Sequence, residues 1–155
     1  MNVLLTGASG HIGSHTLIAL LNSSSVKSIT AVDVVPLPPH IKLDDRAEFK
    51  LVDLTNISAV DDLFTGMPRC NAVIHLGGIP DPKSLEHRLV HNINVTSTYN
   101  VLYTASQRGV KRIVQASSVN AIGLSYTEPE HRWFHAVPFD EDTPCKPEDA
   151  YAVSK

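Results

Sequence analysis

The stretch TGASGHIG, residues 6–13, lies between an apolar run at residues 2–6 and a segment of helical character at residues 11–22. Its three glycines are Gly7, Gly10 and Gly13. In a strand-to-helix turn of this kind, one glycine makes the tight turn, a second lets the backbone approach a pyrophosphate, and a third lets helix and strand pack closely. The N-terminus of the helix then offers free N–H groups to the phosphates. Isolated glycine turns are common, but this position favours a dinucleotide-binding turn.

The rest of the chain continues to alternate strands and helices. Further strands are expected at residues 28–33, 48–52, 72–76 and 111–116, and further helices at residues 57–64, 84–108 and from about residue 148. This alternation implies right-handed crossovers and a parallel sheet. Asn56 or Thr55 is expected to cap the helix that begins at residue 57, and Gly109 to end the long one. The predicted fold class is α/β, a doubly wound parallel sheet of the Rossmann type.

The composition is that of one globular domain and excludes several other classes. The chain has 155 residues, is 43% hydrophobic and carries 13 basic against 16 acidic side chains, a formal charge of −3. This balance gives no electrostatic reason to expect nucleic acid binding, and no apolar run is long enough to cross a membrane. No secretory signal is expected. Because Cys70 and Cys145 lack CxxC spacing, we expect a reducing compartment and a cytoplasmic protein.

Asp33 ends the second predicted strand, 20 residues after Gly13. An acid roughly 20 residues beyond such glycines accepts hydrogen bonds from the ribose hydroxyls and repels a 2′-phosphate. Val34 and Val35 follow it and offer no cation to a phosphate. The pattern therefore favours NAD over NADP, although an aspartate at a strand end can also be merely solvated.

A second group of side chains gathers toward the end of the chain. Ser117 and Ser118 follow the fifth predicted strand, at the sheet edge where open α/β sheets bind ligands. Tyr151 and Lys155 are four residues apart, which places them on one face of a helix. A nearby ammonium favours the phenolate form of a tyrosine, so this phenol is suited to exchange a proton with a substrate oxygen. The set predicts a hydride-transfer site in which a cofactor takes the hydride and the tyrosine takes the proton.

These pieces, in this order, resemble the extended short-chain dehydrogenase/reductase superfamily and, within it, the NAD-dependent epimerase/dehydratase family. The matching segments span the whole chain: TGASGHIG (6–13), Asp33, Asp53-Leu54, HLGG (75–78), NVTST (94–98), ASSVNAIG (116–123) and DEDTPCKPEDAYAVSK (140–155). The chain departs from the family's pattern at Ser97, where glycine is usual, and at Val119, which interrupts a longer serine motif. We expect Ser118 rather than Ser117 to be the catalytic serine.

The resemblance implies a role for each matching residue. The catalytic residues that it implies are Ser118, Tyr151 and Lys155. The cofactor-binding residues that it implies are Gly7, Gly10, His11, Ile12, Gly13, Asp33, Asp53, Leu54, Leu76, Gly77, Gly78, Asn94, Ser117, Tyr151 and Lys155. Among these, His11 and Ile12 are implied to contact the pyrophosphate and Lys155 to hold the nicotinamide ribose. No metal site is expected, because His87 and His91 have ligand spacing without a third ligand.

The implied activity is hydride transfer at a hydroxyl or carbonyl of a sugar or sugar-nucleotide. HLGG with a short serine motif also resembles uronate dehydrogenase, so a free uronic acid is an alternative substrate. Family members continue beyond the position of Lys155 to build a substrate lobe. We therefore expect residues 1–155 to be a dinucleotide-binding domain that is incomplete at its C-terminus and inactive alone. The other hypothesis is a non-catalytic NAD-binding module. A homodimer is expected only in a full-length form. No membrane partner is expected.

Three packing assignments remain. Leu85, Leu89 and Ile93 lie at helical spacing and are interpreted as core. His75, inside an apolar strand, is interpreted as a core histidine with satisfied hydrogen bonds. The irregular segment 124–138 is expected to shape a substrate pocket. Its residues His131, Trp133, Phe134 and His135 are assigned to pocket or surface packing.

Overall fold

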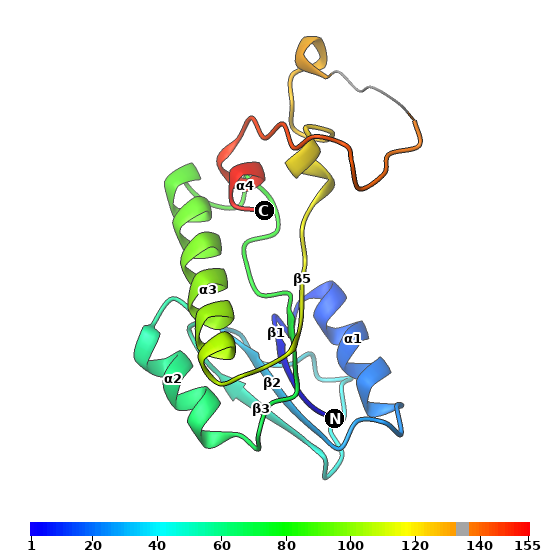
Figure 1. The fold of residues 1–155 in the computed structure, drawn as a ribbon, viewed down its shortest axis with the longest axis vertical. Coiled ribbons are helices and arrows are strands. Elements are labelled where there is room, and N and C mark those ends of the chain that lie inside the picture. Colours follow the sequence, from blue (N-terminus) through cyan, green and yellow to red (C-terminus); the bar gives the residue numbers. More distant parts are fainter. Residues whose placement is uncertain (133–136) are drawn as a thin grey trace. The chain divides into compact units, whose positions relative to one another are not determined.

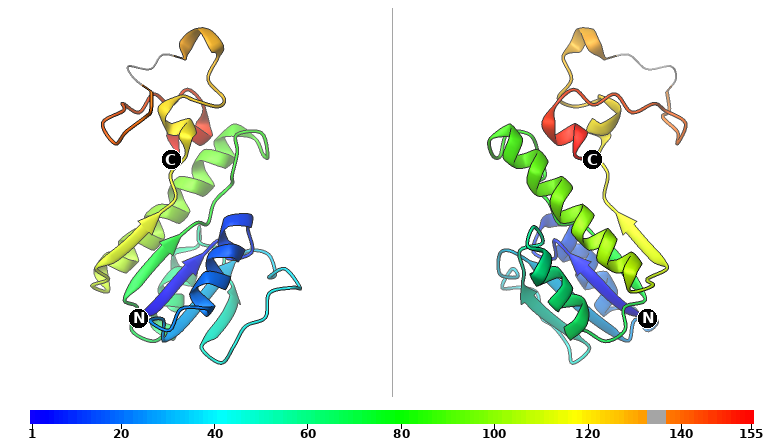
Figure 2. Two further views of the ribbon diagram at one scale, coloured as in Figure 1. Left: turned by 90° about the vertical axis from the view of Figure 1, so that its right-hand side faces the viewer. Right: turned by 60° about the vertical axis from the view of Figure 1, so that its left-hand side comes forward.

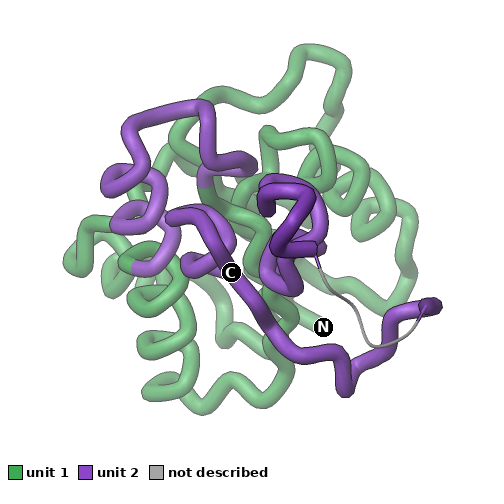
Figure 3. The backbone as a smooth tube through the Cα atoms, turned by 90° about the horizontal axis from the view of Figure 1, so that it is seen from above, with its two compact units in different colours: residues 1–78, 96–115 green, residues 79–95, 116–155 purple. Residues whose placement is uncertain are grey.

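The computed structural model describes residues 1–132 and 137–155. The chain divides into two compact units, residues 1–78 with 96–115 and residues 79–95 with 116–155 (Figure 3). Trp133, Phe134 and His135, which the sequence assigns to pocket or surface packing, lie outside the described residues. No helix within the described ranges has both the length and the apolar character needed to cross a membrane.

The order of elements follows the predicted alternation (Figure 1). The elements are β1 Asn2–Thr6, α1 His11–Leu21, β2 Ser28–Asp33, β3 Ala47–Leu51, α2 Ile57–Gly66, β4 Ala72–His75, α3 His87–Gln107, β5 Arg112–Gln115, the 3₁₀ turns η1 Val119–Ile122 and η2 Pro129–His131, and α4 Ala150–Val153. The strand positions are confirmed to within about a residue. Asn56 is the N-cap of α2, because its side chain accepts a 3.1 Å hydrogen bond from the N–H of Ala59. Gly109 follows α3 with a φ of 72°, a conformation that suits glycine.

The five strands form one parallel sheet in the order β3-β2-β1-β4-β5, which confirms the predicted fold class. Thr6, the last residue of β1, pairs with Val32 of β2 and with His75 of β4. The carboxyl ends of the three central strands therefore lie level with one another. The segments that leave these strands emerge at a single edge of the sheet, on both sides of the point where the strand order reverses.

Helices cover both faces of the sheet (Figure 2), and each face carries its own hydrophobic core. Val3 and Leu5 of β1 pack with Leu17 of α1 on one face. Leu4, between them in sequence, packs on the other face against α2 and the part of α3 that contains Val101. Alternation along a strand produces this division, because successive side chains point to opposite faces. A strand buried on both faces reads as a continuous apolar run, as residues 2–6 do.

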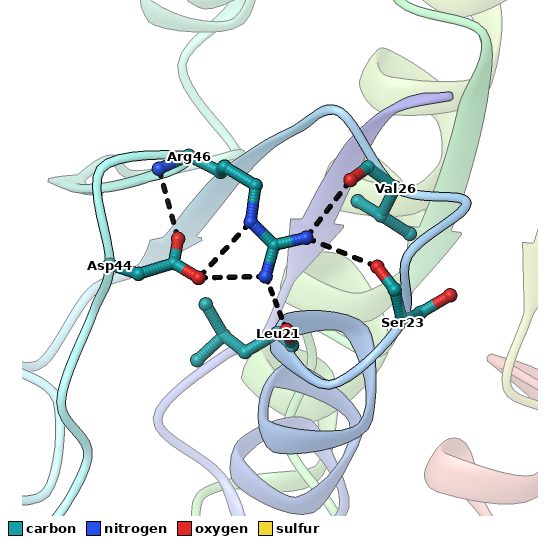
Figure 4. A network of polar contacts seen from close by, with 5 residues as sticks. All are labelled: Leu21, Ser23, Val26, Asp44 and Arg46. Carbon is teal, nitrogen blue, oxygen red and sulfur yellow. Dashed lines mark hydrogen bonds and ion pairs between the residues drawn. The ribbon is translucent and has the colours of Figure 1, made fainter.

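Arg46 joins the end of α1 to the chain segment that precedes β3 (Figure 4). Its guanidinium donates to the carbonyl oxygens of Ser23 at 3.1 Å and Val26 at 3.0 Å, and also to the carbonyl oxygen of Leu21. It also forms an ion pair of 2.7 Å with Asp44. The arginine thus supplies donors to carbonyl groups at and beyond the C-terminus of α1, where the helix itself has none to offer.

The predicted core assignment of the apolar stripe on α3 is wrong. Leu85 precedes the helix and is 43% exposed, and Leu89 is 51% exposed; Ile93 is only partly buried. The buried positions of the helix are Val90, Asn94, Ser97, Asn100, Val101, Thr104 and Ala105. They follow the same helical period, but small and polar residues make up much of the buried face. A count of apolar side chains therefore selects the wrong face of this helix.

Candidate functional site

The three glycines of the turn between β1 and α1 differ in what a side chain would meet at each position. Gly7 has a φ of 68°, and a Cβ there would lie 2.6 Å from the backbone of Leu76 and Gly77. A Cβ on Gly13 would lie 1.8 Å from the carbonyl oxygen of Gly7. A Cβ on Gly10 would meet only that same oxygen, at 3.4 Å. Packing within the protein thus explains Gly7 and Gly13, whereas Gly10 leaves the exposed N-terminus of α1 open to a ligand.

The Asp33 carboxylate at the end of β2 is hydrogen-bonded to the glycine turn. One of its oxygens accepts from the backbone N–H of Ser9 at 2.9 Å, and the other accepts from Val34 at 2.7 Å and Val35 at 3.3 Å. The Ser9 hydroxyl in turn donates to the carbonyl of Val35 at 2.8 Å. The carboxylate is partly exposed and lies beside the turn, with lone pairs left for further donors.

The loop after β3 forms an aspartate turn that α3 holds in place. Asp53 accepts from the N–H of Thr55 at 2.9 Å and from its hydroxyl at 2.7 Å. The side chain of Asn100 donates to the carbonyl of Leu54 at 3.0 Å and of Thr55 at 3.2 Å. Leu54 is buried, and its side chain would lie 3.2 Å from a Cβ built on Gly77. The loops after β3 and β4 therefore meet beside the glycine turn.

The end of β4 is tied to the end of β1 through Thr6. The Thr6 hydroxyl oxygen accepts from the N–H of Leu76 at 3.2 Å and of Gly77 at 3.1 Å. The ring of His75 makes hydrogen bonds to the hydroxyls of Thr6 at 2.7 Å and Thr98 at 3.0 Å. The interpretation of His75 as a satisfied core histidine is therefore confirmed.

In the second compact unit, α4 carries Tyr151 and is followed by Lys155. Asp149 is the N-cap of α4, and its carboxylate accepts from the N–H of Ala152 at 2.9 Å. Tyr151 is buried, and the Lys155 ammonium lies 5.5 Å from the centre of its ring. Burial lowers the pKa of Lys155 below its ordinary value of 10.5, because desolvation penalises the charged form.

Ser118 is the N-cap of η1, the turn that follows β5. Its hydroxyl oxygen accepts from the N–H of Asn120 at 3.1 Å, and the side chain is partly exposed. Accepting this bond leaves the hydroxyl proton available to a further acceptor. Ser117 is exposed, and its side chain is not the N-cap of this turn.

Two buried asparagines connect the segments around α4. Asn120 donates to Asp149 at 2.5 Å, while its side-chain oxygen accepts from the N–H of Ser125 and Tyr126. Asn94 hydrogen-bonds both backbone groups of Ile79, at 2.7 and 3.1 Å. It also donates to the Ser154 hydroxyl at 3.0 Å, and that hydroxyl donates to the carbonyl of Tyr151. Tyr151 is therefore supported from both ends of its helix.

A comparison of the whole sequence with protein families decides the assignment. The profile of the NAD dependent epimerase/dehydratase family matches residues 3–155. The chain belongs to this family.

Relatives within the epimerase/dehydratase family cover nearly all of this chain. Uronate dehydrogenase from Pseudomonas syringae pv. tomato is 29% identical over 153 residues, which cover 99% of this chain and 50% of that protein. UDP-glucose 4-epimerase from Dictyostelium discoideum is 30% identical over 169 residues, which cover 99% of this chain and 44% of that protein. The chain thus spans about half the length of the curated relatives that it matches.

Solved structures of an epimerase and a uronate dehydrogenase also match nearly all of this epimerase/dehydratase chain and about half of their own length. The UDP-glucose 4-epimerase of Thermus thermophilus in complex with NAD superposes with a TM-score of 0.79 at 29% identity, covering 100% of this chain and 47% of that one. A mutated uronate dehydrogenase superposes with a TM-score of 0.77 at 28% identity, covering 99% and 49% of the two chains. The family is NAD-dependent, and structural neighbours of this chain hold NAD.

The predicted family residues fall into two groups, one in each compact unit. The first group surrounds the glycine turn and consists of Gly7, Gly10, His11, Ile12, Gly13, Asp33, Asp53, Leu54, Leu76, Gly77 and Gly78. The second group lies around α4 and η1 and consists of Asn94, Ser117, Ser118, Tyr151 and Lys155. Within the second group, neither Ser117 nor Lys155 takes part in the side-chain hydrogen bonds described around α4 and η1.

Sequence reasoning missed several residues that hold these groups in place. Ser9 lies inside the glycine motif, but nothing in the pattern indicates its bond to Asp33. Asn100 and Asn120 are polar residues that become buried, and single-sequence patterns assign such residues to the surface. Asp149 could have been predicted as an N-cap, because an aspartate directly before the helical segment Ala-Tyr-Ala-Val is typical of that position.

Proposed function

We propose that this chain is the dinucleotide-binding part of an NAD-dependent oxidoreductase, one that transfers a hydride at a hydroxyl or carbonyl of a sugar or sugar-nucleotide. The observation that carries the proposal is the contact between Asp33 and the glycine turn. The backbone N–H of Ser9 holds the carboxylate beside the turn. A phosphate-binding helix N-terminus and a ribose-binding acid are thereby placed next to one another, as an adenosine diphosphate group requires.

The residues around the glycine turn would each contact a different part of a dinucleotide. The open side of Gly10 and the N-terminus of α1, with His11 and Ile12, would hold the pyrophosphate. Asp33 would accept from the ribose hydroxyls, and the valines that follow it offer no cation to a 2′-phosphate. The loop of Asp53 and Leu54 would border the adenine, and Leu76, Gly77 and Gly78 would line the cofactor. NAD is therefore favoured over NADP.

The second group of residues supplies the acid–base part of the proposed reaction. The nicotinamide ring, when bound, accepts or returns the hydride. The phenol of Tyr151 would take the proton from a substrate hydroxyl or return it to a carbonyl. Ser118 would donate its hydroxyl proton to the same substrate oxygen, since its oxygen already accepts from Asn120. Lys155, whose ammonium lies 5.5 Å from the centre of the Tyr151 ring, would hold the nicotinamide ribose.

A free uronic acid is a second candidate substrate, and one comparison favours it. The uronate dehydrogenases of Pseudomonas syringae and Pseudomonas putida align over 153 residues, nearly the length of this chain. The epimerases of Dictyostelium discoideum and Arabidopsis thaliana align over 169 and 166 residues, so those alignments contain gaps. The chain thus follows the spacing of the uronate dehydrogenases more closely.

The proposal is tested first by titrating the 155-residue chain with NADH and NADPH and following the nucleotide fluorescence. Saturable binding that is stronger for NADH supports the cofactor assignment; equal binding contradicts the proposed role of Asp33, and no binding contradicts the proposal. A longer form that continues past Lys155 would then be given NAD with free uronates or with UDP-glucose. Product from neither, despite NADH binding, would support a non-catalytic module.

A further inference from the structure

We propose that His75 is a positioning residue for dinucleotide binding: it fixes the hydroxyl of Thr6, and through it the strand end against which the glycine turn is built. This inference rests on the proposed function. The ring would do so as a neutral imidazole whose proton is on Nε2. The hydrogen bonds concerned all join residues of the first compact unit.

The hydrogen bond between Thr6 and His75 has a definite direction. The Thr6 hydroxyl oxygen accepts from two backbone N–H groups: that of Gly77 at 3.1 Å, and that of Leu76 at 3.2 Å, which also donates to the Thr6 carbonyl at 3.2 Å. A hydroxyl has two acceptor lone pairs and one proton to donate. Because both amides approach the lone pairs of this oxygen, we infer that its proton points to the remaining neighbour, Nδ1 of His75, at 2.7 Å. Thr6 is therefore the donor and Nδ1 the acceptor.

This direction fixes the tautomer of His75. A neutral imidazole that accepts at Nδ1 carries its proton on Nε2. Nε2 lies 3.0 Å from the Thr98 hydroxyl, which can accept that proton. His75 is 2% exposed and Thr6 is fully buried, so water does not compete for these groups. The chain of bonds from Thr98 through His75 to Thr6 therefore has one consistent direction.

These hydrogen bonds reach the glycine turn through the end of β4. The two amides that Thr6 accepts from belong to Leu76 and Gly77, the residues on which Gly7 packs. The contact is so close that a Cβ on Gly7 would lie 2.6 Å from their backbone. Any shift of the strand end would displace Gly7 and the turn it begins. The Thr6 oxygen accepts from these amides, and His75 fixes the orientation of the hydroxyl by accepting its proton.

The tautomer is tested directly in the unsubstituted chain. Uniform ¹⁵N labelling of histidine and a long-range ¹H–¹⁵N spectrum distinguish a ring nitrogen that carries a proton from one that does not. The His75 signals are identified by their loss in the His75→Asn variant. We expect an unprotonated Nδ1 and a protonated Nε2. A proton on Nδ1 overturns the proposal.

The positioning role is tested with matched variants and NADH titrations of the folded protein. Thr6→Val and His75→Phe remove one partner each, and we expect NADH affinity to fall by about tenfold or more. Thr6→Ser and His75→Asn keep a hydroxyl and an acceptor, and we expect them to recover most of the affinity. Thr30→Val is the control, because Thr30 is another buried strand threonine with a side-chain bond, to Glu48 at 3.0 Å.

The outcomes separate a positioning role from a purely structural one. If Thr6→Val and His75→Phe lower the melting temperature as Thr30→Val does but bind NADH as the unsubstituted chain does, the proposal is overturned. If His75→Phe does not fold, the comparison of His75→Asn and Thr6→Ser with Thr6→Val decides. Absence of NADH binding by the unsubstituted chain overturns the proposed function itself, and the role of His75 in binding with it.

Discussion

The backbone N–H of Ser9 donates a 2.9 Å hydrogen bond to the carboxylate of Asp33. The strand-end acid therefore shapes the glycine turn as well as facing the proposed ribose position. A substitution at Asp33 combines two effects, the loss of a ligand contact and the loosening of the turn. The two effects separate when the carboxylate is replaced by an amide.

We expect Asp33→Ala to weaken NADH binding by about ten- to a hundredfold, since it removes the ribose acceptor and the bond to Ser9. Asp33→Asn keeps an oxygen for Ser9 and should lose less affinity. Both variants lack the charge that repels a 2′-phosphate, so the preference for NADH over NADPH should shrink in each. Fluorescence titrations measure all four affinities, with the exposed Asp62→Asn as control. An unchanged preference would count against the ribose assignment.

Gly13→Ala should destabilise the fold severely. Its Cβ would lie 1.8 Å from the carbonyl oxygen of Gly7, and neither backbone can yield without moving the turn. We expect a loss of at least about 3 kcal/mol in the free energy of unfolding. Gly66→Ala is the control, because a Cβ there meets nothing within 4 Å and the residue ends a helix. That variant should be neutral or stabilised by up to about 1 kcal/mol. Urea denaturation of both variants measures the difference.

Arg46→Met should cost about 1–3 kcal/mol of unfolding free energy, because three backbone carbonyls lose a charged donor. Arg88→Met is the matched control. Arg88 also pairs with an acid at 2.9 Å, but its side chain is 86% exposed and its ion pair is with Glu86, a close neighbour in sequence. We expect less than about 0.5 kcal/mol there. Equal losses in thermal or urea unfolding would show that the carbonyl contacts of Arg46 contribute nothing.

Lys155 should make stability rise with pH in the alkaline range. Burial lowers its pKa in the folded state, so the unfolded chain binds this proton more tightly. Below its lowered pKa, the buried Lys155 ammonium destabilises the folded state. This destabilisation is relieved as pH rises from the lowered pKa toward 10.5. Lys155→Met should therefore melt higher at neutral pH, with the advantage disappearing toward pH 10.5. Melting temperatures across this range, with the exposed Lys42→Met as control, test the sign.

The pair formed by Asn120 and Asp149 should tolerate reversal but not the loss of one member. Asn120→Ala leaves the amides of Ser125 and Tyr126 without their acceptor and should cost about 1–3 kcal/mol. In the double variant Asn120→Asp with Asp149→Asn, the new carboxylate accepts from the new amide, and asparagine still caps α4. Hydrogen exchange at the N–H of Ala152, from which Asp149 accepts, reports the result. Faster exchange in the reversed pair than in Asn120→Ala would contradict this account.

Part of the candidate site was predictable because its signals are local. Glycine spacing at residues 7–13, the apolar run at residues 2–6 and the acid at the end of β2 each occupy one short segment. The register that brings Thr6 level with Val32 and His75 follows from parallel pairing of such runs. The buried face of α3 was predicted wrongly because it depends on contacts between distant segments. Its buried face contains Asn94 and Asn100, whose burial is stabilised by hydrogen bonds that no local pattern encodes.

The sequence by itself determined the order of strands and helices, the parallel sheet and the place of the glycine turn, because side-chain periodicity and glycine geometry act over a few residues. Only the tertiary structure decided which polar groups hold the site. Thr6 and His75 are 69 positions apart, and Asn120 and Asp149 are 29 apart. A buried polar side chain is stable only where the fold supplies its partner. That partner is chosen by the packing of distant segments, which a sequence pattern does not display.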